Sequence, residues 1–112
     1  MSKRKTYTIF LSLEDRIDVD LEFEKRPRNP PRLSRFAITY SARIADRWRE
    51  VVRYDSFHGY LHRQRLWRSS RPEPLSEMER LPAGDILAIC RDDLRQNWRR
   101  YRALMESAME ED

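Results

Sequence analysis

A chain of 112 residues fits one domain with a single core, since domains of this size bury roughly two-thirds of the unfolded surface. A hydrophobic content of 39% suffices for that core, whereas 38% charged residues with a net charge of +4 predict a densely ionic surface. The single cysteine excludes an internal disulfide and favours a reducing cytoplasm, and no apolar run approaches the roughly 20 residues that span a membrane.

The first two-thirds of the chain alternate between apolar and polar residues, which is typical of strands with one face on a core. Within a sheet over about residues 5–67, the alternation predicts five strands, at about residues 7–13, 17–24, 35–44, 48–57 and 60–67. The connections are short, so neighbouring strands are expected to pair antiparallel. The first strand is expected to direct one row of side chains to the core: Tyr7, Ile9, Leu11 and Leu13.

Residues 25–34 hold three prolines, and we predict a loop there because proline cannot donate a hydrogen bond to a strand ladder. A connector is predicted over residues 68–84. Within it, Ser76 and Glu79 have the spacing of a capping box that opens one helical turn.

From about Asp85 the apolar residues recur every three or four positions, which predicts an amphipathic helix over residues 85–108 with Asp85 as its cap. The predicted stripe is Leu87, Cys90, Leu94, Trp98, Tyr101, Met105 and Ala108. A sheet with one apolar face and a helix with one apolar stripe bury each other. The fold prediction is therefore a single α+β domain over residues 1–112, an antiparallel sheet of about five strands with one C-terminal helix on one face (βββββα).

Charge is unevenly distributed along the chain. The acidic face of the second strand is expected to pair across strands with Arg35 and Arg43. Residues 47–71 carry seven arginines against two acids, and the helix carries a second basic stripe. Twenty of the 23 basic residues are arginine, which binds phosphates bidentately, although genomic codon bias is an equally good explanation.

Both histidines fall in one stretch, RYDSFHGYLHRQRLW, from Arg53 to Trp67. Gly59 lies between His58 and His62 and permits the positive φ that a turn requires. Pairing of the flanking strands around this turn would bring the two imidazoles together near its tip.

Three kinds of chemistry fit this grouping. As metal ligands, His58, His62 and Asp55 are fewer than the four that a structural zinc site takes, so we predict no metal and no cofactor. In RNA cleavage, the imidazoles transfer protons, Asp55 orients one of them, and arginines stabilise the phosphorane. In a structural role, the same side chains would only satisfy and pack the turn.

Residues 53–62, RYDSFHGYLH, resemble the signature of TumE-like toxins of bacterial toxin–antitoxin systems and their relatives, and residues 89–101 resemble the helix that ends those proteins. The resemblance implies an antitoxin partner and growth inhibition through RNA. Carried over by residue, it points to Arg53, Tyr54, Asp55, His58, Gly59 and His62. This chain has Arg63 and Gln64 where the relatives often place another histidine, so a purely binding member is an alternative.

The leading hypothesis is a small prokaryotic cytoplasmic protein that binds or cleaves RNA, as a metal-independent endoribonuclease if it is an enzyme. Its catalytic candidates are His58, His62 and Asp55. Its RNA-binding candidates are Arg53, Tyr54, Tyr60, Arg63 and Arg65. The rival hypotheses are a non-catalytic protein-interaction module and a plain structural domain. Candidate partners are an antitoxin, RNA and a second copy of the chain, with no membrane.

Overall fold

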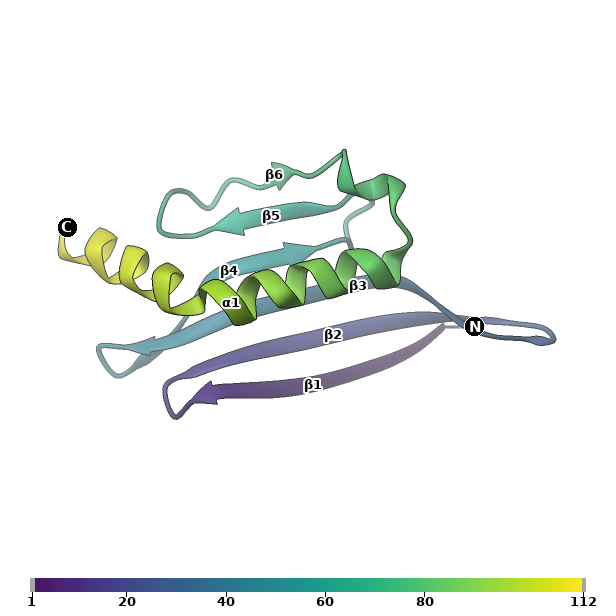
Figure 1. Cartoon of the computed structure of the whole chain (residues 1–112), viewed down its shortest axis with the longest axis horizontal. Coiled ribbons are helices and arrows are strands. Elements are labelled where there is room, and N and C mark those ends of the chain that lie inside the picture. The colour runs from purple at the N-terminus through teal and green to yellow at the C-terminus, as the bar shows by residue number, and fades with distance from the viewer. Residues whose placement is uncertain (1, 112) are drawn as a thin grey trace.

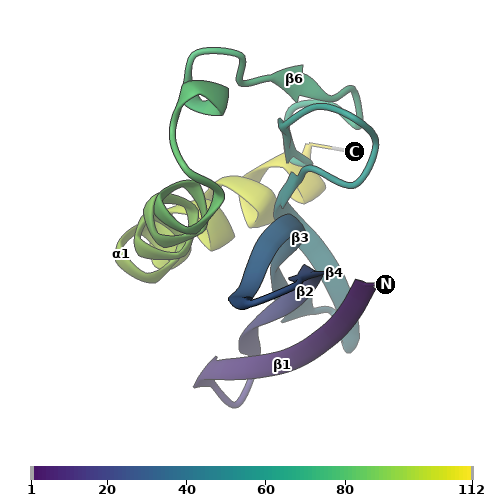
Figure 2. The ribbon, with the colours of Figure 1, turned by 90° about the vertical axis from the view of Figure 1, so that its right-hand side faces the viewer.

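The computed structural model describes residues 2–111, which form a sheet of six antiparallel strands in chain order followed by one long helix (Figure 1). The elements are β1 (Ser2–Ser12), β2 (Asp15–Arg26), β3 (Asn29–Ile44), β4 (Arg47–Asp55), β5 (His62–Arg65), β6 (Glu73–Pro74), the 3-10 turn η1 (Met78–Arg80) and α1 (Ala83–Glu110). The helix lies on one face of the sheet (Figure 2). The predicted α+β fold is confirmed, with six strands where about five were expected.

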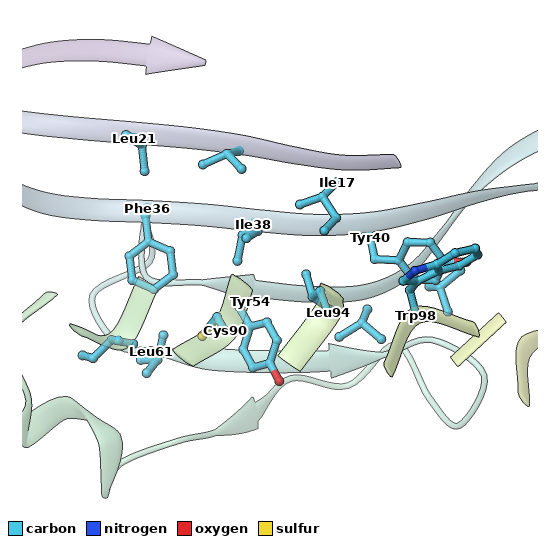
Figure 3. Packing of buried hydrophobic residues seen from close by; sticks show 14 of the residues in the cluster. Ile17, Leu21, Phe36, Ile38, Tyr40, Tyr54, Leu61, Cys90, Leu94 and Trp98 are labelled. Atoms are coloured by element: carbon cyan, nitrogen blue, oxygen red, sulfur yellow. The ribbon is translucent and has the colours of Figure 1, made fainter. Parts of the chain in front are cut away.

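The core lies between α1 and one face of β2, β3 and β4 (Figure 3). The predicted alternation holds there, since Ile17, Phe36 and Ile38 are essentially buried. Burial of a large apolar side chain contributes about 1.5–3 kcal/mol, so this layer holds the helix on the sheet. From α1 the buried side chains are Ile86, Cys90, Leu94 and Trp98, of which Ile86 lay outside the predicted stripe.

The proline-rich segment does not form the predicted loop. β2 runs to Arg26 and β3 begins at Asn29, so only residues 27–28 make the turn, with Arg28 at φ 62°. Residues 30–31 are prolines within β3, at a register shift opposite Lys25. Unpaired positions at such a bulge tolerate proline, which explains why the strand continues through them.

Three local predictions are wrong. Leu13 lies in the β1–β2 turn with 95% of its surface exposed, because the register shifts after Phe10. Helix α1 begins at Ala83, so Asp85 lies in the first turn and no side chain caps the helix. The helical turn at η1 exists but has no side-chain cap, and Glu79 instead accepts a hydrogen bond from the Leu61 amide at 2.6 Å.

We call the sheet face opposite α1 the outer face. Glu22 of β2 pairs there with Arg35 of β3 at 2.7 Å, as expected. Asp20 pairs with Arg4 of β1 at 2.7 Å, which was not predicted. Arg43 instead lies 3.8 Å from Asp46 in the next turn. Within residues 2–111, α1 lacks the length of apolar sequence needed to cross a membrane.

Candidate functional site

The predicted site residues divide between the two faces of the sheet. Directly opposite residues of antiparallel strands share a face, and Asp55 pairs with His62 while Tyr54 pairs with Arg63. Since side chains alternate along β4, Arg53 and Asp55 lie on the outer face and Tyr54 on the face that α1 covers. The outer face therefore receives Arg53, Asp55, His58 and His62, and the helix-bearing face receives Tyr54, Arg63 and Arg65.

The turn brings the two imidazoles together. The ring centroids of His58 and His62 lie 6.0 Å apart, at an interplanar angle of 25°. Gly59 takes the positive φ of 89° that the turn requires. His58 is exposed, whereas His62 is 4% exposed and its Nδ1 is buried without a hydrogen-bond partner. A buried polar atom without a partner is rare in folded proteins and marks this pair as unusual.

Asp55 does not orient an imidazole as predicted. Its Oδ2 accepts hydrogen bonds from Arg53 Nε at 3.1 Å and Arg53 Nη2 at 2.8 Å. Its Oδ1 accepts the Phe57 amide at 2.7 Å. The Nε2 atom of His58 lies 3.9 Å from Oδ2, beyond hydrogen-bond distance. The buried carboxylate therefore fixes the Arg53 guanidinium and the start of the turn.

Arg53 lies on the outer face against Asp55, which pairs with His62 across the strands, and one-third of the Arg53 side chain is exposed. Besides Asp55, it donates to Thr39 Oγ1 at 3.1 Å and lies 3.6 Å from Glu50. It borders an outer-face hollow of about 480 Å³, lined by Thr6, Tyr7, Thr8, Asp18, Val19, Asp20, Ala37, Thr39 and Arg53. These contacts hold the guanidinium in one place and leave part of it open to solvent.

The two tyrosines predicted to stack on a base have different environments. Tyr60 is 42% exposed, and its ring centroid lies 5.1 Å from that of His62. Tyr54 is 5% exposed and donates its hydroxyl hydrogen to Asp93 Oδ2 at 2.7 Å. Burial, and then the bond to Asp93, raises the pKa of Tyr54, so it stays neutral as a core residue. Of these two rings, only that of Tyr60 is open to solvent.

Arg63 and Arg65 do not join the histidine pair. Arg63 Nε lies 2.9 Å from Glu73 Oε2, and Arg65 Nη2 lies 2.6 Å from Glu73 Oε1. The hydrogen bond from Arg65, with that from Arg63, lowers the pKa of Glu73. The two arginines thus tie β5 to β6 on the helix-bearing face.

A polar cluster around Asp93 was not predicted. The carboxylate accepts hydrogen bonds from Tyr54 at 2.7 Å, Tyr101 at 2.7 Å and Asn97 at 3.0 Å. Burial and the bond to Asp93 raise the pKa of Tyr101 to about 12. Asp93, Asn97 and Tyr101 recur every four residues on one side of α1, and this spacing was the signal available in the sequence.

A second unpredicted cluster surrounds the buried carboxylate of Asp15 at the start of β2. It accepts hydrogen bonds from Ser12 at 2.6 Å, Tyr40 at 2.6 Å and Arg102 at 2.8 Å. Burial alone would raise the pKa of Asp15, but these three bonds bring it below the ordinary value. Arg102 also donates to the carbonyl oxygen of Arg43, so it fastens α1 to β2 and β3.

Cys90 lies in the core, where burial and the nearby charge of Asp93 raise its thiol pKa to about 12. A thiol that stays protonated is a poor nucleophile and a poor metal ligand. Within residues 2–111, no three side chains of histidine, cysteine, aspartate or glutamate gather closely enough to hold a metal ion.

The profile of a protein family described as a domain of unknown function, DUF7718, matches residues 1–110. No curated protein and no solved structure matches the chain. Because the match covers nearly all 112 residues, the chain belongs to the DUF7718 family.

Proposed function

We propose that the outer face around His58 and His62 binds RNA and cleaves its phosphodiester bonds without a metal. The observation that carries the proposal is the pair of imidazoles 6.0 Å apart, one exposed and one buried with an unpartnered Nδ1, on the same face as Arg53. Histidine titrates near neutral pH and serves as either acid or base. The resemblance of residues 53–62 to TumE-like toxins supports the same reading, with an antitoxin as partner and the cytoplasm as location.

In this mechanism one imidazole takes the proton of the 2′-hydroxyl while the 2′-oxygen attacks the phosphorus. The other imidazole, protonated, gives its proton to the departing 5′-oxygen. The products are a 2′,3′-cyclic phosphate and a free 5′-hydroxyl. Arg53, held by Asp55, stabilises the charge on the phosphorane, and Tyr60 stacks on a neighbouring base.

The test is cleavage of a fluorescent single-stranded RNA in EDTA by the wild type, His58→Ala and His62→Gln. Loss of a general acid or base lowers a rate by about 10²–10⁴-fold, so each variant should lose at least 100-fold. Arg95→Ala on the exposed side of α1 is the matched control and should cleave as the wild type does. RNA methylated at the 2′-oxygen should remain intact, because it lacks the nucleophile.

Cleavage that survives loss of both histidines would contradict the catalytic assignment. Binding is measured separately by fluorescence anisotropy across salt concentrations. Affinity that falls steeply with salt, and falls further in Arg53→Gln, supports a phosphate contact. Salt-dependent binding without cleavage would make the chain an RNA-binding protein and not a nuclease.

The second candidate function is a non-catalytic interaction module. It is favoured by β1, an 11-residue strand at the edge of the sheet whose residues are exposed or half-buried. Growth inhibition by a His58→Ala, His62→Gln double variant expressed alone would favour this candidate over the nuclease.

A further inference from the structure

β1 forms an open edge of the sheet. It pairs with β2 on one side, and no other strand of residues 2–111 pairs with its second side. Such an edge presents unpaired amide and carbonyl groups that pair readily with another strand. The opposite edge is β6, which has only two residues, so β1 is the longer template by far.

The two halves of β1 differ in chemistry. Lys3, Arg4 and Lys5 protect the first half, because edge lysines discourage unwanted pairing. The second half, residues 6–11 (TYTIFL), has no charge, glycine or proline, and its Phe10 is 68% exposed. Uncharged segments of this length with high β propensity aggregate when they stay uncovered. We therefore expect another strand to pair with residues 6–11 of β1.

We propose that β1 of a second copy of this chain covers the edge, as an antiparallel pair with its two-fold axis at Thr8. In this register Tyr7 of each copy faces Ile9 of the other, and Thr8 faces Thr8. The uncharged halves overlap. At about 3.4 Å per residue the two Lys5 positions lie roughly 20 Å apart, more than twice the Debye length at physiological salt.

The existing contacts of β1 favour a second copy over an acidic strand from another protein. Arg4 already donates both Nε and Nη2 to Asp20, at 3.0 Å and 2.7 Å, which leaves only two lysines to attract acids. An acidic strand paired with β1 would also place carboxylates beside the apolar side chains of Ile9 and Phe10, which is unfavourable. Self-pairing extends the sheet, and it brings together the two outer-face hollows, each of which Thr6 and Thr8 line.

The proposal is independent of RNA cleavage and is tested on the full chain without RNA. Light scattering after gel filtration should give a dimer mass at about 100 µM for the wild type. Thr8→Cys should form a disulfide-linked dimer on mild oxidation, because the two sulfurs meet at the axis and Cys90 is buried. Thr6→Cys is the matched control and should not cross-link, since in this register its copies are four residues apart.

Thr8→Lys sets two ammonium groups opposite each other and should shift the chain to monomer, whereas Ile89→Lys, on the exposed side of α1, should remain dimeric. Circular dichroism melting verifies that both variants fold. A wild-type chain that stays monomeric overturns the proposal. A dimer that Thr8→Cys does not cross-link, or that Thr8→Lys leaves intact, also overturns it.

Discussion

The two faces of the sheet use the same kinds of side chain in different ways. On the helix-bearing face, the Asp15 and Asp93 carboxylates each accept hydrogen bonds from three side chains, and Glu73 accepts from Arg63 and Arg65. On the outer face, the Asp55 carboxylate is likewise satisfied, but the neighbouring His62 imidazole has a buried atom with no partner.

The difference separates carboxylates whose hydrogen bonds hold the fold together from an imidazole with an unmet hydrogen bond. A hydrogen-bonded carboxylate in the core contributes to stability, and its removal leaves other buried groups unpaired. The His62 Nδ1 atom is buried without such a bond, so it adds no comparable stabilisation. Hydrogen-bond saturation therefore distinguishes these carboxylates from His62, and Arg91 Nε of α1 is also buried without a partner.

The largest effect is expected where a charge pair on the helix-bearing face is broken. Arg102→Met leaves the Asp15 carboxylate buried without its cation, and we expect the free energy of unfolding to fall by about 3 kcal/mol. Urea denaturation at pH 7 measures this loss. Arg95→Met, on the exposed side of α1, should change it little.

The same pair predicts a pH dependence. The pKa of Asp15 is lowered in the folded chain, so its contribution is present at neutral pH and is lost as the pH falls through the folded-state value. The wild type and Arg102→Met should therefore converge in stability in strong acid. A difference that does not shrink there would show that Arg102 acts through packing alone.

A smaller loss is expected at the Asp93 cluster. Tyr54→Phe removes one of three hydrogen bonds to the carboxylate and should lower the free energy of unfolding by about 1–2 kcal/mol. Tyr60→Phe is the matched control on an exposed ring and should be neutral. If the two substitutions lowered stability equally, the hydrogen bond from Tyr54 to Asp93 would not be what stabilises the fold there.

The smallest effect, of opposite sign, is expected at the histidine pair. His62→Phe replaces an unsatisfied buried imidazole with an apolar ring of similar shape, so stability should stay equal or rise by up to about 1 kcal/mol. Thermal melting measures the change, with His58→Phe on the exposed turn as control. A clear loss of stability would mean that the His62 imidazole has a partner that holds the fold.

Much of the fold was predictable because it depends on local periodicity. The alternation from Ile17 to Phe23 and the three- and four-residue steps from Cys90 to Trp98 each specify one apolar face, and two apolar faces must cover each other. The loop prediction for the proline-rich segment was wrong because two of its prolines lie at a register shift within β3. A register shift depends on the partner strand and cannot be predicted from the segment alone. The capping prediction for Asp85 was wrong because Pro82 occupies the N-cap position of α1. The capping-box prediction was wrong because Glu79 accepts a hydrogen bond from the Leu61 amide instead.

Only those contacts of the candidate site that lie within one turn of the chain were predictable from the sequence. Gly59 between two histidines indicated a turn that draws them together, and the turn does so at 6.0 Å. The sequence could not show that Arg53 lies on a different face of the sheet from Arg63 and Arg65. The face depends on the register in which β5 pairs with β4, and a spacing of ten or twelve residues across a turn does not determine that register.

The sequence by itself determined the α+β class, the faces of the long strands and the meeting of His58 with His62, because each follows from the conformation of neighbouring residues. Only the tertiary structure decided which polar groups are satisfied. Asp93 accepts a hydrogen bond from Tyr54, Asp15 accepts one from Arg102, and Glu73 pairs with two arginines. The His62 Nδ1 atom has no partner. The reason is physical: these partners lie on different elements, and strand register with helix placement sets the distances between them.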